Sequence, residues 1–182
     1  MKIGILTSSR ADYGIYLPLL TELKKNSVIK FEIIAFGTHL SNEYGYTVQD
    51  IIKDGYKTIH KVCSIGKDDS EKGVGTSYGN VVIDFSNFWS NNNFDLVFCL
   101  GDRFEMSAAV QASIPFGIKL AHIHGGETTL GAIDDKLRNA ISQLSSIHFT
   151  SADIHKQKVQ NMILTKKNIF DIGPLVIDGL LN

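Results

Sequence analysis

The stretch Asp95-Leu-Val-Phe-Cys-Leu-Gly-Asp-Arg-Phe-Glu105 decides the fold of this chain. Its first half is an almost unbroken apolar run, which is typical of a strand that is buried on both faces of a parallel sheet. Gly101 and two charged residues follow at once, and a helical segment is expected from Phe104. A buried strand that leads through a short polar loop into a helix is one unit of an α/β protein with a parallel sheet.

The same alternation of strand and helix runs outward from this unit in both directions. Strands are expected at residues 2–7, 28–36, 56–63, 95–100, 118–124, 147–150 and 169–172. Helices between them are predicted by apolar residues at helical spacing, for example Leu137, Ala140, Ile141 and Leu144. Thr150 and Asp153 have the spacing of a capping box, which predicts a helix from Ser151 to Ile163. With right-handed crossovers, about seven strands form one open Rossmann-like sheet, a single domain over residues 1–182.

Composition and charge exclude several classes of protein. Eighteen Lys and Arg against nineteen Asp and Glu leave a formal net charge of -1, so nucleic acid and anionic membrane surfaces are not expected partners. The apolar runs are far shorter than the roughly 20 residues that cross a bilayer, and no apolar signal-peptide core follows Met1. We therefore expect a soluble cytoplasmic protein. Cys63 and Cys99 lie in separate predicted strands without C-x-x-C spacing, which indicates reduced structural thiols.

Two stretches imitate nucleotide-binding motifs without their context. Gly73-Val-Gly-Thr-Ser-Tyr-Gly79 has glycines at the wrong spacing for a dinucleotide fingerprint and does not follow the first strand. Ser64-Ile-Gly-Lys67 lacks the upstream glycine and the following Ser or Thr of a P-loop. We therefore expect neither hydride transfer nor ATP hydrolysis.

Polar residues gather just after the predicted strands, where open parallel sheets bind their ligands. The richest segments are Thr7–Gly14, Gly37–Ser41, Gly101–Glu105 and His122–Glu127. Arg103 stands beside a helix N-terminus, an arrangement that suits phosphate, and Arg10 with Asp12 repeats the pairing of Arg and Asp in the first loop.

The carboxylates in this region each have two interpretations. Asp102 either takes part in catalysis or only caps the helix that begins at Phe104. Asp134 and Asp135 open a helix, where they either serve a site or only complement the helix dipole.

His122 and His124 form an H-x-H pattern on a predicted strand, which would place both imidazoles on one face and raises a zinc site as an alternative. No third ligand with recognisable spacing follows, so we expect no metal. The glycines at 125 and 126 allow a ligand to approach the backbone closely, which favours His124 as a site residue with Glu127 at the rim.

Six motifs occur in order along the chain, namely Ser9-Arg-Ala-Asp-Tyr13, Gly37-Thr-His-Leu40, Gly101-Asp-Arg-Phe-Glu105, His122-Ile-His-Gly-Gly-Glu127, Ile133-Asp-Asp-Lys-Leu-Arg138, and Gly173-Pro174 with Asp178. Together they resemble the hydrolysing UDP-N-acetylglucosamine 2-epimerases of sialic acid biosynthesis. The resemblance implies a glycosyltransferase-B architecture, of which this chain would be the N-terminal domain without the C-terminal UDP-binding domain. It also implies a homo-oligomer built through the N-terminal domain. The aromatic stripe at Phe85, Phe88 and Trp89 is a candidate contact, although ordinary core is the preferred interpretation.

The resemblance also implies a reaction. UDP-N-acetylglucosamine and water would give UDP and N-acetylmannosamine, through loss of UDP to a 2-acetamidoglucal and then hydration, with no cofactor. Proton transfers would fall to Asp102 and to one member of the Asp134–Asp135 pair. Some relatives carry a catalytic Glu where His124 stands, so here either His124 or Glu127 takes that role. The residues expected to bind substrate are Arg10, Asp12, His39 and Arg103.

Three alternatives stay open at this point. A UDP-diacetamido sugar of the legionaminic acid type would need the same chemistry. A glycosyltransferase would share the fold and UDP, although acid-rich strand ends suit proton transfer at carbon better. A non-catalytic module of the receiver type would need a phosphorylatable Asp after the third strand, which this sequence does not show. Turnover by this chain without a second domain is not expected.

Overall fold

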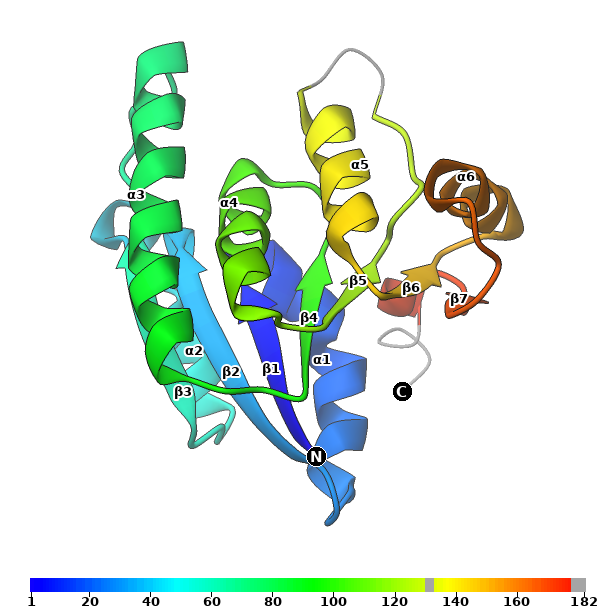
Figure 1. Cartoon of the computed structure of the whole chain (residues 1–182). Helices are drawn as coiled ribbons and strands as arrows, with labels where there is room; N and C mark the ends of the chain where they lie inside the picture. Colours follow the sequence, from blue (N-terminus) through cyan, green and yellow to red (C-terminus); the bar gives the residue numbers. More distant parts are fainter. Residues whose placement is uncertain (130–132, 178–182) are drawn as a thin grey trace.

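The computed structural model describes residues 1–129 and 133–177, and its centre is a seven-stranded sheet in the order β3-β2-β1-β4-β5-β6-β7 (Figure 1). All neighbouring strands are parallel. The strands are β1 (Lys2–Thr7), β2 (Lys30–Gly37), β3 (Ile59–Ser64), β4 (Leu96–Leu100), β5 (Leu120–Ile123), β6 (Ile147–Thr150) and β7 (Ile169–Asp171). The α-helices are α1 (Arg10–Lys25), α2 (Val48–Lys53), α3 (Glu71–Asn91), α4 (Phe104–Ser113), α5 (Asp134–Leu144) and α6 (Asp153–Ile163). The Rossmann-like sheet predicted from the sequence is confirmed.

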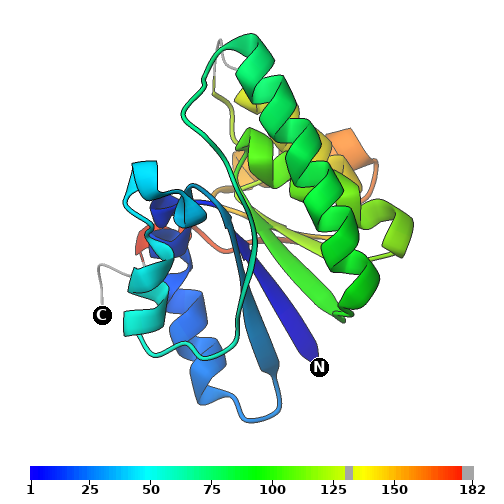
Figure 2. The same cartoon turned by 90° about the vertical axis from the view of Figure 1, so that its left-hand side faces the viewer.

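Helices cover both faces of the sheet. Figures 1 and 2 show α3, α4 and α5 on one face and α1 and α2 on the other, while α6 lies beside β6 and β7. Each face has its own apolar core. One contains Phe36, Val97 and Met106, and the other contains Ile5 and Ile33. The order of the strands reverses between β1 and β4, so the loops after these two strands diverge and leave the place where ligands bind in such sheets.

The aromatic stripe on α3 is core, so its interpretation as an oligomer contact is wrong. Phe85 is fully buried, Trp89 is 2% exposed, and Phe88 packs partly buried against the same cluster. The indole nitrogen of Trp89 donates a hydrogen bond of 3.3 Å to the carbonyl oxygen of Ala109 on α4. The stripe therefore joins α3 to α4 and to the sheet.

Several predicted boundaries move in the structure. The third strand begins at Ile59, later than the expected residue 56, and β5 ends at Ile123. The capping box at Thr150 and Asp153 is wrong, because α6 begins at Asp153 with Ala152 as its N-cap and no side chain caps it. The segment 73–79 lies inside α3, which confirms that its glycines do not form a nucleotide loop.

Both cysteines are free and buried, which confirms their prediction as structural thiols. Burial raises the pKa of Cys63 and of Cys99 to about 12, so neither is a thiolate near neutral pH. Within the described residues, no helix has both the length and the apolar character that spanning a membrane requires.

Gly126 allows the chain to pass close to α6. Its φ is +83°, and a Cβ at this position would clash with the carbonyl oxygen of His155 and lie 3.0 Å from Cγ2 of Val159. We expect Gly126→Ala to lower the free energy of unfolding by about 2 kcal/mol or more, because the left-handed backbone conformation and the clash both add cost. Chemical denaturation measures this change.

Gly14 provides the matched control for this prediction. It lies inside α1, and a Cβ there would meet no atom within 4 Å. Gly14→Ala should raise the free energy of unfolding by about 0.5–1 kcal/mol, because alanine has less conformational entropy to lose. Equal changes in both variants would contradict the role given to Gly126.

Candidate active site

Arg138 joins the ends of β4 and β5 into one polar cluster. Its Nη2 donates to a carboxylate oxygen of Asp102, in the loop after β4. Its Nη1 donates to Oε2 of Glu127 at 2.9 Å and to the carbonyl oxygen of His124 at 3.0 Å, both in the loop after β5. The guanidinium is nearly buried, with 7% of its side chain exposed. Asp102 therefore pairs with an arginine and does not cap α4, whose N-cap makes no side-chain hydrogen bond.

Glu127 is held on both carboxylate oxygens. Ser151, the first residue after β6, donates its hydroxyl to Oε1 at 2.5 Å, while Arg138 occupies Oε2. Burial alone would raise the pKa of Glu127, but the hydrogen bond from Ser151 and the neighbouring His124 and Arg138 outweigh it and lower the pKa below its usual range. Glu127 is therefore ionised at neutral pH.

His124 stands in an unusual backbone conformation directly after β5. Its φ is +64°, in the left-handed region. Residues other than glycine rarely adopt this backbone conformation, and those that do are often found at functional sites. Nδ1 lies 3.6 Å from Oε1 of Glu127, and Nε2 is buried without a hydrogen-bond partner among the described residues. Burial lowers the pKa of His124, against the opposing charge of Glu127. A neutral imidazole with a vacant nitrogen can accept or donate one proton.

Asp134 and Asp135 both lie in the first turn of α5, but their surroundings differ. Asp135 lies 3.6 Å from Nζ of Lys158 on α6, and the same ammonium donates to Oγ1 of Thr128 at 2.7 Å. The charge of Asp134 instead acts on Arg103. Asp135 therefore fastens α5 to α6, whereas the charge of Asp134 is one of those that raise the pKa of Arg103.

Arg103 is the N-cap residue of α4 and pairs with a carboxylate of the same helix. Its Nε donates to Oε1 of the fully buried Glu105 at 2.5 Å. Burial opposes the charge of Arg103, but the charge and hydrogen bond of Glu105, with the charges of Asp12 and Asp134, outweigh it and raise the pKa of the guanidinium. With 43% of the side chain exposed, Arg103 offers a cation to an anionic ligand.

The remaining predicted site residues lie after β1 and β2. Arg10 is the exposed first residue of α1. The buried carboxylate of Asp12 accepts hydrogen bonds from the backbone and the hydroxyl of Ser8, at 2.9 and 2.7 Å. His39 is buried, with Nε2 3.0 Å from Oγ1 of Thr7 and Nδ1 2.8 Å from Oγ1 of Thr47.

These contacts hold the loops in place, and any role of Arg10, Asp12 and His39 in substrate binding stays a prediction. Burial lowers the pKa of His39 to about 4, against the charge of Asp12, so its ring is neutral at physiological pH. A neutral ring with both nitrogens engaged fixes the spacing between the loops that follow β1 and β2.

The H-x-H pattern does not form a pair on one strand, because β5 ends at Ile123 and His124 belongs to the loop. His122 is fully buried and uses both ring nitrogens, Nδ1 with Oγ of Ser142 and Nε2 with the carbonyl oxygen of Gly101, each at 2.9 Å. In the described part of the chain, no three His, Cys, Asp or Glu side chains are arranged to hold a metal ion.

Three residues of this site were missed by reasoning from the sequence. Arg138 lies four residues after Asp134, a spacing that is typical of an ion pair on a helix surface. It also lies three residues before the buried Ile141, at the edge of the apolar stripe, and this position is the signal that could have indicated its burial. Ser151 directly follows β6. Because the helix predicted from the sequence began at this residue, it was not considered as a residue at a strand end. Nothing in the pattern around Lys158 distinguishes it from a solvated lysine.

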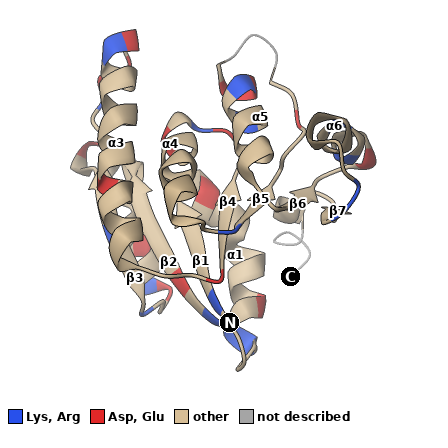
Figure 3. Cartoon of the chain, viewed as in Figure 1, with Lys and Arg blue, Asp and Glu red and all other residues tan. Residues whose placement is uncertain are grey.

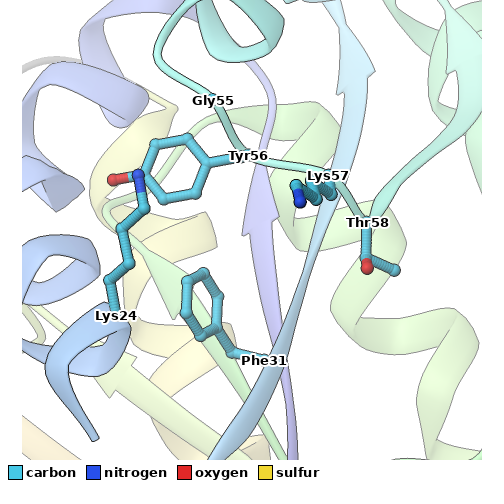
Figure 4. Close-up of a pocket in the computed structure, with 6 residues that line it drawn as sticks. All are labelled: Lys24, Phe31, Gly55, Tyr56, Lys57 and Thr58. Atoms are coloured by element: carbon cyan, nitrogen blue, oxygen red, sulfur yellow. The ribbon is translucent and has the colours of Figure 1, made fainter.

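A pocket of about 230 Å³ lies elsewhere, at the amino-terminal edge of the sheet (Figure 4). Its lining residues are Lys24, Phe31, Gly55, Tyr56, Lys57 and Thr58. The ammonium of Lys24 stands 4.8 Å from the centre of the Tyr56 ring and donates to the carbonyl oxygen of Asp54 at 3.4 Å, so it is already occupied within the chain. The candidate site lies at the opposite end of the strands, because open parallel sheets bind ligands at the carboxyl ends of their strands.

Charge is distributed without a dominant sign. Figure 3 shows acidic and basic segments interspersed along the described chain, as the net charge of -1 implies. The cationic groups of the candidate site are thus local, at Arg103 and Arg138, and each is matched by carboxylates.

Curated proteins of similar sequence match this chain along nearly its whole length. A polysialic acid biosynthesis protein P7 from Escherichia coli is 35% identical over 181 residues, which cover 100% of this chain and 46% of that protein. A GDP/UDP-N,N'-diacetylbacillosamine 2-epimerase (hydrolyzing) from Campylobacter jejuni is 34% identical, with coverage of 96% and 45%. The chain therefore spans about half the length of these curated relatives.

Solved structures show the same fold. The crystal structure of UDP-GlcNAc 2-epimerase from Neisseria meningitidis bound to UDP-GlcNAc superposes with a TM-score of 0.83 at 21% identity, and covers 100% of this chain and 48% of that one. The sheet and its flanking helices therefore match the N-terminal half of a glycosyltransferase-B-like epimerase. The sequence profile described as UDP-N-acetylglucosamine 2-epimerase matches residues 21–182. The chain belongs to the UDP-N-acetylglucosamine 2-epimerase family.

Proposed function

We propose that this chain is the sugar-side half of a hydrolysing UDP-sugar 2-epimerase that converts UDP-N-acetylglucosamine and water into UDP and N-acetylmannosamine. The observation that carries the proposal is the cluster of Asp102, Glu127 and His124 around Arg138, with Asp134 in the first turn of α5 and Arg103 at the N-cap of α4. Paired carboxylates, a neutral imidazole and a partly exposed guanidinium are the groups that this reaction needs.

The reaction divides into two steps that these groups can serve. In the elimination, a base takes the proton from sugar C2, the C–H electron pair forms the C1–C2 double bond, and the C1–O bond breaks to release UDP. In the hydration, water adds its hydroxyl to C1 and a proton reaches C2 on the opposite face. Asp102, Asp134, Glu127 and His124 supply the proton acceptors and donors, and Arg103 stabilises the departing diphosphate.

A second half, of the kind that the longer relatives have, completes the protein in this proposal. The curated relatives are about twice as long as the part that this chain covers, and solved relatives from Neisseria meningitidis and Methanocaldococcus jannaschii bind UDP-GlcNAc or UDP. A glycosyltransferase-B architecture clamps the nucleotide sugar between two domains, so this chain alone should not turn over substrate. The buried free thiols of Cys63 and Cys99 support a reducing, cytoplasmic location. Assembly into a homo-oligomer belongs to the same proposal.

A UDP-diacetamido sugar is the second candidate substrate. The relatives from Campylobacter jejuni and Legionella pneumophila, 34% and 33% identical, are both named as hydrolysing epimerases of N,N'-diacetylbacillosamine nucleotides. The two substrates differ at the sugar C4 and C6 groups, and the proton transfers at C2 are common to both.

Proton NMR in deuterated water tests the proposal. UDP-N-acetylglucosamine and the UDP-diacetamido sugar are each incubated with this chain and with the chain extended by a second half. We expect UDP and a C2-deuterated 2-epimer from one of the two sugars with the extended protein alone, because a base exchanges the C2 proton with solvent. An extended protein that is folded and leaves both sugars intact would overturn the proposed reaction.

A further inference from the structure

Ser151 contacts the candidate catalytic machinery from the loop after β6, next to the strand whose Phe149 carbonyl accepts a hydrogen bond of 2.9 Å from the backbone of His124. The residue follows β6 directly and lies 24 residues from Glu127 in sequence, yet its hydroxyl donates to Oε1 at 2.5 Å. The carboxylate of Glu127 is 28% exposed, and Arg138 takes the other oxygen. The loops after β5 and β6 thus meet at one carboxylate.

The direction of this hydrogen bond follows from chemistry. An ionised carboxylate can only accept, so the single hydroxyl proton of Ser151 is committed to Oε1. Hydrogen bonds to a charged acceptor are shorter and stronger than those between neutral groups, as the 2.5 Å separation reflects. Nδ1 of His124 lies 3.6 Å from the same oxygen, beyond hydrogen-bond distance, so the Ser151 hydroxyl is the closer of the two groups to Oε1.

We propose that Ser151 is a positioning residue that holds Glu127 as the ionised, proton-accepting carboxylate of the site. This inference rests on the proposed function. In the elimination, the proton of sugar C2 moves onto the Glu127 carboxylate, the C–H electron pair forms the C1–C2 double bond and the C1–O bond breaks to release UDP, while Ser151 keeps its own proton. Glu127 therefore acts as a base, and the acid of the site must be one of the other groups.

The hydrogen bond favours the charged form of Glu127, and this gives the test its direction. A base is active above its pKa, and its activity falls as the pH drops through that value. Loss of the hydroxyl in Ser151→Ala raises the pKa of Glu127, so the acid limb of the kcat/KM profile should move to higher pH by roughly one unit, a tenfold change in the ionisation constant.

Two further variants separate positioning from a structural role. Ser151→Thr keeps the hydroxyl, so the acid limb of its kcat/KM profile should stay at the wild-type pH. Ser151→Cys is nearly isosteric but a weak donor, so its limb should lie between those of wild type and Ser151→Ala. Ser90→Ala is the matched control, because this exposed hydroxyl on α3 donates only to the carbonyl oxygen of Asn87, and its removal should leave the profile unchanged.

A second measurement does not depend on turnover. The carboxyl carbon of Glu127, labelled with ¹³C in this chain, reports its pKa by NMR titration, and Ser151→Ala and Ser151→Cys should both raise it. A pKa and an acid limb at wild-type positions in both variants would overturn the positioning role while leaving the proposed function intact. A wild-type extended protein that acts on neither UDP-sugar would overturn the function itself, whatever the titration gives.

Discussion

Arg138→Met should lower the free energy of unfolding of this chain by about 3 kcal/mol, the largest loss of stability that we expect from a single substitution. The guanidinium is 7% exposed and compensates two carboxylates, Asp102 and Glu127, which come from separate loops. Methionine fills a similar volume without charge, so the two carboxylates would be left without their common cation. This loss of stability is at the lower end of the range for removing one partner of a buried ion pair, because the side chains of Asp102 and Glu127 are still 20% and 28% exposed.

The measurement is denaturant unfolding at several pH values. The pKa of Glu127 is lowered in the folded chain, so its ion pair contributes stability above the ordinary value of 4.5, and this contribution is lost as the pH falls through the lowered pKa. The difference between wild type and Arg138→Met should therefore narrow below about pH 4.5. A loss of stability that does not change with pH would show that packing, and not charge, is what Arg138 provides.

Lys53→Met is the matched control for this substitution. Lys53 pairs with Asp50 across one turn of α2 at 3.5 Å, and the two side chains are 74% and 45% exposed. Exposed pairs of this kind are screened by water and salt, so the expected change is below about 0.5 kcal/mol. A comparable loss in both variants would contradict the special place given to Arg138.

Asp102→Asn should reduce kcat of the extended protein by roughly 100-fold or more, as the loss of an acid or base that transfers protons does. The amide oxygen of asparagine can still accept from Nη2 of Arg138, so the geometry of the cluster is kept while the carboxylate is lost. Circular dichroism and unfolding should differ little from wild type. Initial rates of UDP release measure the effect, and C2 deuterium incorporation shows whether proton abstraction is the step affected.

Asp50→Asn makes the same chemical change at an exposed position and should leave kcat within a factor of about two. Turnover near the wild-type rate in Asp102→Asn would remove Asp102 from the proton transfers. In that case Asp102 would be a partner of Arg138 only, and Asp134 and Glu127 would remain as the candidate carboxylates.

The fold could be predicted from the sequence because its signals are local. An apolar run such as residues 96–100 needs no knowledge of distant segments to be recognised as a buried strand. The rule that ligands bind at strand ends then placed Asp102, His124 and Glu127 in one region without coordinates, and the structure brings these three together around Arg138.

The parts that could not be predicted depend on long-range partners. Whether a carboxylate caps a helix or pairs with an arginine is decided by what lies opposite, and for Asp102 that partner is 36 residues away. The same holds for Thr150, whose hydroxyl contacts the carbonyl oxygen of Phe170 on β7 at 3.4 Å and caps nothing. Local spacing fits both outcomes equally well.

The two flanks of the sheet divide the site into parts that can change independently. Asp12 and His39 bond to groups at the end of β1 and in the loops after β1 and β2, whereas the network of Arg138 joins α5 to the segments after β4, β5 and β6. The loops after β1 and β2 can therefore change in sequence without disturbing the contacts of Arg138 with Asp102 and Glu127. Under the proposed function, such a division would let one scaffold diversify across related nucleotide sugars while the carbon chemistry is inherited unchanged.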